Sequence, residues 1–497
     1  MLSLDTFASH AIAAFVVLVA SFYFYVKYTY NYWTRKNVPQ LPPAFPFGNF
    51  NALFSKSFSF GPITKHYYDD LKKAGHAFGG VYIGMTPHMV MVDERLGRNV
   101  LTKDFQFFVN RGLYNRPNAK TTANIFFQDN QEWKIKRPKL TVIFTTAKLK
   151  LFFNTIKQCA DELEANMYKV SDGNNDVDIY ENMGCYFTDV ISSLVFGIEA
   201  KSFKDPDAAI RTAGRMLFTD IPIPYQLCLF LAIAYPNIAK ILRVPPMPLK
   251  VENFFLKLVP ETMEYRKKNN IYRNDLLQLL IELEESGSII SNDIIAETFN
   301  FFIAGFETST TVSTYLLYEL AKRKDIQEKI RKEVNEVLKK YNGEFTYDAM
   351  QELPYMAQAI DEAMRKYPPL ATLTRVCASD YQIPGTDVII EKGTPVIIPV
   401  LGYHLNPDYF PEPMKFNPDR FEGNVKYEGY LPFGDGPRNC IGERLGLLQS
   451  KVGIASLIKK YEFSLSPNMK GELVLDEDYF VTRATDKILL RLKKVEN

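Results

Sequence analysis

The sequence predicts a mainly α-helical protein with small β-sheets and a single N-terminal transmembrane helix. Three observations support this fold class: an uncharged apolar segment over 6–26, an apolar helical pattern of about thirty residues from Ser291, and Pro and Gly recurring every few residues over 384–442. The composition is globular, since 46% of the 497 residues are hydrophobic and 23% are charged. Disorder, collagen and coiled coil are excluded as descriptions of the whole chain.

The balance of charges and of metal-binding side chains excludes several functions. Lys and Arg together exceed Asp and Glu by only two charges, so we expect no nucleic-acid partner. The five cysteines include no CxxC pair and the five histidines no HExxH pair, which disfavours a disulfide framework and a zinc site. The 14% aromatic content indicates a large apolar interior, or one that receives an apolar ligand.

The N-terminal segment is predicted to be a membrane anchor. Its 21 residues over 6–26 carry no Asp, Glu, Lys or Arg, and at 1.5 Å per residue they span about 30 Å as a helix. Tyrosines crowd its C-terminal end, and Lys27, Arg35 and Lys36 follow, whereas only Asp5 precedes. The positive-inside rule then places the body in the cytoplasm. A cleaved secretory signal would need a basic start and a shorter apolar core, and no Arg-rich transit peptide is present, so we expect an endoplasmic reticulum membrane protein.

A proline-rich strap follows the anchor. Four prolines over 38–48 forbid a helix and favour a stiff extended segment. We therefore expect a membrane anchor over 1–37, a strap over 38–50 and a catalytic domain over 51–497.

The first half of the body mixes extended and helical patterns. Residues 81–84 and 89–93 are typical of a hairpin with Thr86 and Pro87 in its turn, and 148–167 is amphipathic and helical. The uncharged run over 221–239 is interrupted by prolines and predicts two short apolar elements joined by a loop. Its side chains belong either to the core or to a surface that touches the membrane.

The strongest predicted helix runs from Ser291 to about Arg323. Ser291 or Asn292 can cap it, and because it is apolar nearly all round its middle it should cross the protein interior. Residues 322–340 continue as a charged helical stretch, which we expect to be a solvated face.

Chemistry concentrates first in the segment FGDGPRNCIG, which contains Cys440 and precedes a helix-like stretch. A cysteine just before a helix lies at the positive end of the helix dipole, which lowers its pKa and favours the thiolate. Gly434 and Gly436 let the backbone fold towards the sulfur, Gly442 leaves room for a flat group, and Arg438 can bind a carboxylate. This pattern suits haem iron ligation, whereas a glycine-rich turn around an inert cysteine is the structural alternative.

This segment, which begins at Phe433, resembles the FxxGxRxCxG signature of the cytochrome P-450 haem-thiolate monooxygenases. Further motifs follow the order of that family over most of the chain. The resemblance implies the cytochrome P-450 fold, a haem b cofactor, and Cys440 as its iron ligand. Phe433, Arg438 and Gly442 would then contact the haem.

The segment AGFETS lies in the middle of the long helix. Gly305 weakens the helix locally, Thr308 can bond a carbonyl one turn back or a ligand, and Glu307 places a costly carboxyl group in an apolar helix. A bent helix with a satisfied threonine is the structural alternative. The segment resembles the family's (A/G)Gx(D/E)T(T/S) oxygen-activation motif, which implies that Thr308, helped by Glu307 and water, supplies protons.

Two further motifs concern haem binding. Glu362 and Arg365, three residues apart, resemble the family's ExxR element, and Arg420 follows in a PERF-like segment whose usual Glu is Asp419 here. The resemblance implies that these three charges fix the cysteine loop. Trp133 and Arg137 resemble the WxxxR element, which implies contact with the haem propionates, and Arg375 matches a further propionate-binding arginine more weakly. A basic surface of Lys134, Lys136, Lys139 and Arg444 is either solvated charge or a dock for an acidic electron-transfer protein.

The resemblance as a whole implies insertion of one oxygen atom from O2 into apolar small molecules. It also implies electrons from NADPH through a reductase, with cytochrome b5 as an optional donor. RGLYN near Arg111 and LTRVC near Arg375 resemble microsomal enzymes of the insect and vertebrate xenobiotic clan, whose substrates include plant toxins, insecticides, hormones and fatty acids. We expect the substrate chamber to be lined by Phe301, Phe302, Ala304, 111–127, the run near Ile221, and 370–373. A peroxide isomerase or dehydratase and a non-catalytic haem sensor remain as alternatives.

Overall fold

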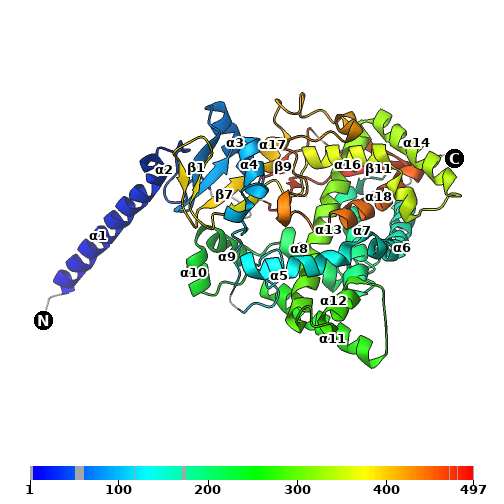
Figure 1. Cartoon of the computed structure of the whole chain (residues 1–497), viewed down its shortest axis with the longest axis horizontal. Coiled ribbons are helices and arrows are strands. Elements are labelled where there is room, and N and C mark those ends of the chain that lie inside the picture. The colour runs from blue at the N-terminus through cyan, green and yellow to red at the C-terminus, as the bar shows by residue number, and fades with distance from the viewer. Residues whose placement is uncertain are drawn as a thin grey trace.

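A computed structural model of the chain describes residues 4–50, 61–116, 118–170, 175–469, 471–477 and 479–495. Helices make up most of the body, small sheets lie among them, and a long N-terminal helix projects away from the rest (Figure 1). The predicted fold class, mainly α with small sheets and one apolar N-terminal helix, is confirmed.

The α-helices of the described residues are α1 Leu4–Tyr30, α2 Tyr32–Arg35, α3 Thr64–Lys73, α4 Glu94–Leu101, α5 Asn130–Thr141, α6 Thr146–Val170, α7 Ile179–Phe196, α8 Ala209–Phe218, α9 Ile223–Ala234, α10 Pro236–Ile241, α11 Leu249–Lys268, α12 Leu276–Glu285, α13 Ser291–Lys322, α14 Lys324–Lys340, α15 Tyr347–Gln351, α16 Pro354–Lys366, α17 Val400–His404 and α18 Glu443–Lys460. The predicted helix over 148–167 lies within α6. Among these helices, α13 makes its most extensive contact with α7.

The strands are β1 Phe78–Ile83, β2 Thr86–Met91, β3 Val177–Asp178, β4 Leu373–Val376, β5 Tyr381–Gln382, β6 Ile389–Ile390, β7 Pro395–Ile398, β8 Tyr461–Leu465, β9 Leu475–Asp476, β10 Arg483–Ala484 and β11 Leu489–Lys494. They form a sheet in the order β1-β2-β7-β4, a second in the order β3-β11-β8, and the pairs β5-β6 and β9-β10. In the first sheet β2 and β7 are parallel, whereas its other pairs are antiparallel.

The N-terminal helix ends against the first sheet. Its part Ser9–Tyr30 is long and apolar enough to cross a membrane and is 6% buried. At its end the Tyr30 ring packs on Tyr82, with ring centroids 5.0 Å apart, and Trp33 is fully buried over Gly80. The strap is held to β1 because the Gly80 N–H donates to the carbonyl of Pro39 at 2.7 Å. The N-terminal helix and the body are thus joined by a packed contact.

The predicted hairpin is present, but its turn is not at Thr86 and Pro87, so that part of the prediction is wrong. Those two residues belong to β2, where Thr86 pairs with Ile83 and Pro87 with Tyr82. The turn forms one step earlier because Gly84 adopts a φ of +58°, which a residue without a Cβ adopts at little cost.

The long helix α13 crosses the interior as expected, but its predicted cap is wrong. The helix begins at Ser291 with Ile290 as the capping residue, and the Asp293 carboxylate accepts the Ile290 N–H at 3.1 Å. The Ser291 hydroxyl instead donates to Glu284 of α12.

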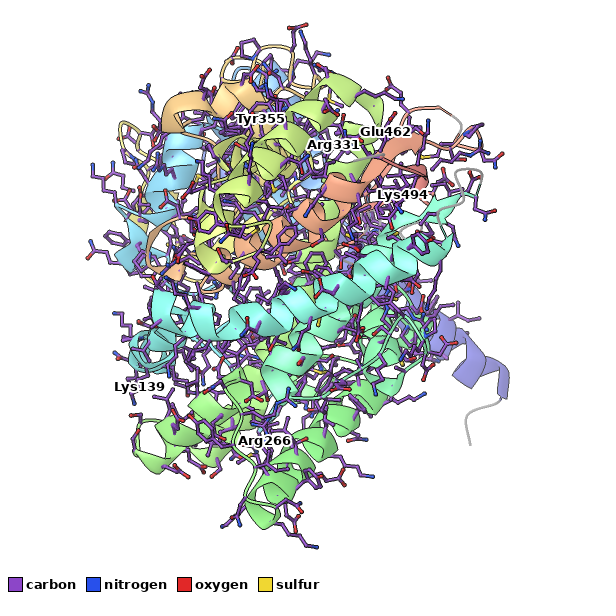
Figure 2. The ribbon with its side chains drawn as sticks, turned by 90° about the vertical axis from the view of Figure 1, so that its right-hand side faces the viewer. Lys139, Arg266, Arg331, Tyr355, Glu462 and Lys494 are labelled. Carbon is purple, nitrogen blue, oxygen red and sulfur yellow. The ribbon has the colours of Figure 1, made fainter. Side chains whose placement is uncertain are left out.

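The charged stretch after α13 is only partly a solvated face. Ile330 and Val334 of α14 are fully buried. Arg331 is also buried, and its guanidinium donates to the carbonyls of Ile458 and Tyr461 at 2.8 and 2.9 Å, where α14 meets α18 and β8 (Figure 2). The many charged residues favoured the prediction of a fully solvated stretch, but α14 is an amphipathic helix with one face in the core.

The apolar run over 221–239 forms α9 and most of α10, joined at Tyr235 without a longer loop. It lies at the end of the body from which α1 projects (Figure 1). Ile223 is 81% exposed and Leu227 55%, whereas Phe230 and Ala234 are buried, so the run serves both core and surface. In the described residues α8 and α9 together also have the length and apolarity of a membrane span, but they are bent by 52°.

Candidate functional site

The cysteine loop is built by hydrogen bonding and by close backbone packing. The Cys440 N–H donates to the Phe433 carbonyl at 2.9 Å, which closes the loop. Gly436 has a φ of +70°, and a Cβ there would lie 1.9 Å from the Leu101 carbonyl oxygen, so only glycine fits. At Gly442, the capping residue of α18, a Cβ would meet only Phe144 at 3.9 Å, which leaves space beside the sulfur.

The Cys440 thiol does not have the lowered pKa that the sequence predicts. Its pKa is raised, chiefly by burial, although the Gly442 N–H and the guanidiniums of Arg137 and Arg111 act in the opposite direction. The side chain nevertheless has an exposed surface, which therefore faces a space surrounded by protein rather than bulk solvent. The helix dipole is a weaker influence here than desolvation, so thiolate formation needs a cation at the sulfur.

Four arginines gather beside the cysteine loop: Arg111, Arg137, Arg375 and Arg438. Their pKa values are all lowered, first by burial and, for three of them, by repulsion from other members of the group; those of Arg375 and Arg438 fall to about 9 and about 10. Because a guanidinium stays protonated in proteins, these shifts express mainly the free-energy cost of taking the charges out of water, with a smaller cost from their mutual repulsion.

The guanidiniums of this arginine cluster form no ion pair with a carboxylate in the described part of the chain, and only Asp129, at longer range, raises the pKa of Arg438. Arg137 donates to the carbonyl and side-chain oxygens of Asn439, both at 2.8 Å, and Arg111 donates to the carbonyl of Arg438 at 2.9 Å. The buried Nε atoms of Arg375 and Arg438 have no hydrogen-bond partner among the residues that the structure describes. Such a cluster suits a ligand that carries carboxylate groups.

Trp133 belongs to the same site through a stacking contact. It is buried on α5, and the guanidinium carbon of Arg438 lies 4.4 Å from the centroid of its ring. The structure thus brings Trp133, Arg137, Arg375 and Arg438 together, and their contact with haem propionates stays a prediction. Sequence reasoning placed Arg111 only among chamber residues and missed its place in the cluster.

The helix α13 is exposed at one place in its middle. Ala304 is exposed and Thr308 is half-buried, although the helix around them is almost wholly buried. The Thr308 hydroxyl donates to the Ala304 carbonyl at 2.7 Å, one of the two arrangements that the sequence leaves open. Gly305 faces away from the site, because a Cβ there would lie 2.5 Å from Ile191 of α7. Its small size therefore allows helix packing.

Glu307 is buried on the side of α13 that meets α7. Its carboxylate accepts a hydrogen bond from the Tyr180 hydroxyl. Burial raises the pKa of Glu307, while Tyr180 and the guanidiniums of Arg211 and Arg483 counteract part of that rise. The carboxyl group is therefore paired, and its partner is 127 residues away in the chain, where no sequence motif marks it.

Gln449 links the helix after the cysteine to α13. Its Nε2 donates to the Gly305 carbonyl at 2.9 Å and to the Ser309 hydroxyl at 2.7 Å. Cys440 and Thr308 thus lie on elements that are tied together by one side chain. Sequence reasoning missed Gln449, because only the packing of α18 on α13 brings it there.

The three charges of the ExxR and PERF-like elements do meet. Arg365 and Glu362 are fully buried and form a two-bond pair, at 2.6 and 2.8 Å, and the Arg420 Nε lies 3.3 Å from the same carboxylate. His404 connects this pair to the cysteine loop. Its Nδ1 contacts the Arg365 carbonyl at 3.1 Å and its Nε2 accepts the Leu431 N–H at 2.9 Å, so the ring is neutral with its proton on Nδ1.

Neighbouring residues differ from their predicted roles. Asp419, where the family pattern has Glu, lies outside the buried triad and contacts Lys329 at 3.3 Å. Of the predicted basic surface, Lys136 pairs with Asp293 and Lys139 donates to the Ser288 carbonyl. Lys134 and Arg444 are exposed, and Arg444 donates to the Thr146 hydroxyl at 2.6 Å.

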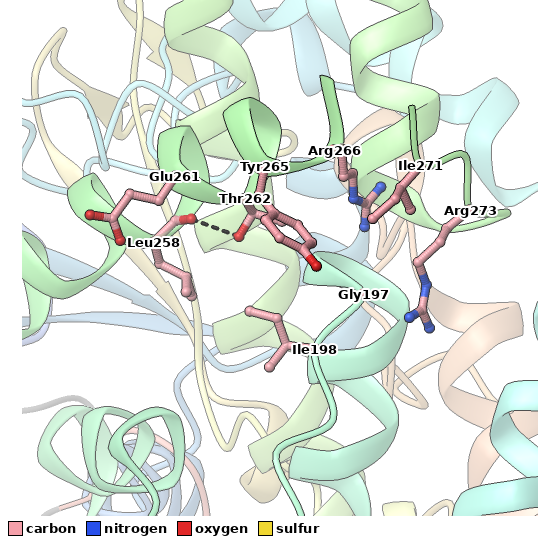
Figure 3. A pocket seen from close by; sticks show the side chains of 9 residues that line it. All are labelled: Gly197, Ile198, Leu258, Glu261, Thr262, Tyr265, Arg266, Ile271 and Arg273. Carbon is pink, nitrogen blue, oxygen red and sulfur yellow. Dashed lines mark hydrogen bonds between the residues drawn. The ribbon is translucent and has the colours of Figure 1, made fainter. Parts of the chain in front are cut away.

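The predicted chamber is only partly supported. Phe302 is fully buried in a cluster with Phe196, Phe255 and Phe306, so it does not line an open space. Two hollows of about 310 and about 680 Å³ lie elsewhere, the first between α11 and the end of α7 (Figure 3) and the second beside α6. Neither is lined by Cys440 or Thr308.

Comparisons with known proteins agree with this geometry. The family model described as Cytochrome P450 matches residues 39–491. A probable cytochrome P450 6a13 of Drosophila melanogaster is 37% identical over 483 residues, which cover 95% of this chain and 97% of that protein. Cytochrome P450 6A1 of Musca domestica is 35% identical over 92% of this chain and 93% of its own length.

Proposed function

This chain belongs to the cytochrome P450 family and is accordingly a monooxygenase, and we propose that it is a membrane-anchored enzyme that oxidises apolar xenobiotics or endogenous hormones and lipids. Members of the family use haem iron. We propose haem b as the cofactor and the Cys440 thiolate as its metal ligand. When bound, the haem supplies the oxygen chemistry, and the protein supplies binding, orientation and protons.

One observation carries the proposal: four arginines, of which Arg375 and Arg438 are buried and none forms an ion pair with a carboxylate among the described residues, lie beside an exposed cysteine sulfur. A haem carries two propionates, and a coordinated thiol is deprotonated outright, so both groups fit the residues present. We propose that Trp133, Arg137, Arg375 and Arg438 hold the propionates, together with Arg111. Phe433 and Gly442 then lie against the cofactor.

We propose catalytic roles for Thr308 and Glu307 beside the cysteine. The Thr308 hydroxyl already holds a hydrogen bond along α13 and can pass a proton into the space at Ala304. Burial raises the pKa of Glu307, which favours its protonated form and so suits a proton donor in that segment. The apolar surroundings of α13 exclude bulk water from the reaction.

We propose electron transfer from an NADPH-dependent reductase, with cytochrome b5 as an optional donor. The exposed Lys134 and Arg444 support docking of an acidic partner by electrostatic steering. We further propose an endoplasmic reticulum location with the body in the cytoplasm, and a division into anchor 1–37, strap 38–50 and catalytic domain 51–497, of which 51–60 lie outside the described residues. The single apolar helix supports the anchor.

The test is a reduced carbon monoxide difference spectrum of membranes that contain the chain. We expect the strongly red-shifted Soret band of a thiolate-ligated haem, its loss in Cys440→Ser, and its retention in Cys159→Ser, a matched control on α6. Haem binding without that band in the parent would overturn the assignment of Cys440. Dependence of product formation on NADPH and reductase then separates a monooxygenase from an isomerase that acts on peroxides.

A further inference from the structure

A hollow of about 310 Å³ lies where α11 passes the end of α7, and the proposed function makes no use of it (Figure 3). The residues that line it come from the end of α7, from α11 and from the segment between α11 and α12, and none of them belongs to the site around Cys440. Its volume is at the lower end of the range for small-molecule sites, about 300–1,000 Å³. The hollow is therefore large enough to hold a small organic ligand.

Apolar side chains form much of the wall of this hollow. Ile198, Leu258 and Ile271 line it, and all three are half-buried, so their carbon atoms border the space without being closed off by the core. Tyr265 adds an aromatic ring that is 62% exposed. An apolar ligand group that covers these side chains removes their surface from water, which favours binding.

The positive charge at one end of the hollow is not balanced by a carboxylate of its own. Arg266 and Arg273 lie at that end and Glu261 at the other (Figure 3). The Asp275 carboxylate forms a two-bond pair with Arg266, whereas the Arg273 Nε lies 3.7 Å from the same carboxylate. Glu261 has Lys257 at 3.8 Å. One carboxylate thus serves two guanidiniums, and the end at Arg273 carries a surplus positive charge.

The wall at this end has a fixed geometry, whereas Arg273 remains accessible. Gly197 ends α7 with a φ of +68°, and a Cβ there would lie 2.3 Å from the Arg266 guanidinium, so only glycine allows that approach. Arg266 also donates to the Phe196 carbonyl at 3.0 Å and is 5% exposed. The Arg273 side chain is 41% exposed. Arg273 is therefore the cation that a ligand in the hollow can reach.

We propose that this hollow binds a small amphipathic anion, with its apolar body against Ile198, Leu258 and Ile271 and its carboxylate on the Arg273 guanidinium. A guanidinium offers two parallel N–H donors that match the two oxygens of a carboxylate. A neutral ligand leaves the surplus charge unpaired, and a cationic ligand is repelled by it. The site is separate from the proposed oxygen chemistry, because neither Cys440 nor Thr308 lines it.

The experiment measures binding of 2-naphthoate to the detergent-solubilised, haem-loaded full chain by isothermal titration calorimetry. Saturating 1-phenylimidazole, an apolar ligand of haem iron, occupies the space at the haem, and a constant Soret band during the titration shows that it stays bound. We expect a single site for 2-naphthoate. Binding of neutral 2-naphthamide and of cationic 2-naphthylmethylamine, which have the same ring system, should be at least about tenfold weaker, since neither forms the charged pair.

Two variants address the two halves of the site. Arg273→Gln removes the charge and leaves the pair of Arg266 and Asp275 intact, so we expect about tenfold weaker binding of 2-naphthoate and unchanged binding of 2-naphthamide. Ile198→Trp fills the apolar half and should abolish binding of both. The matched control is Arg95→Gln, an exposed arginine on α4 outside the hollow, which should leave both affinities unchanged. An unaltered carbon monoxide band in each variant verifies that it is folded.

Thermal unfolding gives a second readout. A ligand that binds only the folded chain stabilises it, so 2-naphthoate should raise the unfolding temperature of the parent and of Arg95→Gln more than that of Arg273→Gln. Equal affinity of the parent and Arg273→Gln for 2-naphthoate would overturn the role of the guanidinium. Tighter binding of 2-naphthylmethylamine would overturn the anionic class of ligand. Absence of binding at millimolar 2-naphthoate, the weakest range expected for a ligand of this size, would overturn the site itself.

Discussion

Replacing Glu297 by Gln should stabilise the protein, and by more as the pH rises. Glu297 is fully buried on α13 and accepts the Ile125 N–H at 2.9 Å. Burial raises its pKa to about 8 in spite of the nearby Lys136. A Gln at this position keeps an acceptor oxygen for Ile125 but does not titrate, so the variant isolates the cost of burying the carboxyl group.

The expected size follows from the two pKa values. In the unfolded chain the Glu297 carboxyl has its ordinary value of 4.5, and in the folded protein about 8. Below the unfolded pKa the carboxyl is protonated in both states, and its contribution to the free energy of unfolding is complete. As the pH rises from the unfolded pKa to the folded pKa, only the unfolded chain releases the proton, so this contribution is lost. At about 1.36 kcal/mol per pH unit, and with half of the folded carboxyls charged at pH 8, Glu297→Gln should be more stable than the parent by about 2 kcal/mol at pH 6 and about 4 kcal/mol at pH 8.

The assay is urea unfolding of the detergent-solubilised parent and variant between pH 5 and 8, read as the difference in free energy of unfolding. Other titrating groups act equally on both chains and cancel in that difference. Glu297→Ala is the control, since it leaves the buried Ile125 N–H without an acceptor and should cost about 1–3 kcal/mol relative to Gln at every pH. Parallel curves for the parent and Glu297→Gln would refute the reasoning.

Three further predictions concern burial of charge. Arg365→Lys removes a two-bond contact inside a fully buried pair, so we expect a loss of about 3–5 kcal/mol in unfolding free energy and a weakened carbon monoxide band. Arg375→Leu removes a proposed partner of a haem propionate, so we expect faster haem transfer to apomyoglobin. Because the change also relieves repulsion in the arginine cluster, the apoprotein should lose no stability; equal transfer rates would contradict the prediction. Burial lowers the pKa of His88 to about 4 and of His404 to about 3, so stability is present above pH 6.5 and lost below it. Read as the difference between the parent and His88→Gln, in which other titrating groups cancel, unfolding free energy should fall by about 2 kcal/mol from pH 6.5 to pH 5, and a flat difference would count against it.

Features set by short spacing could be predicted from the sequence. Glu362 and Arg365 are three residues apart on one helix, so their pairing needs no knowledge of the fold. The tight approach at Gly436 is likewise implied by glycines around Cys440. The anchor follows from an uncharged length that matches a bilayer.

Features that depend on burial or on distant contacts could not be predicted. The helix dipole at Cys440 is visible in the sequence, but the desolvation that outweighs it is set by the surrounding protein. Tyr180 and Gln449 reach α13 only through the packing of α7 and α18. The turn at Gly84 was not predicted because Thr86 and Pro87 nearby form a common turn signal, whereas here both residues belong to strand β2.

The polar groups of α13 explain how a mostly apolar helix acquires one fixed position. Apolar packing is non-directional, so it tolerates small rotations and shifts along the helix axis. Glu297 binds the loop at Ile125, Glu307 binds Tyr180 of α7, and the Gly305 carbonyl binds Gln449 of α18. These three contacts point in different directions from one helix, so any rotation that improves one of them breaks another. Because unmade buried hydrogen bonds are costly, the helix is held in one register, with Ala304 and Thr308 as its more exposed positions.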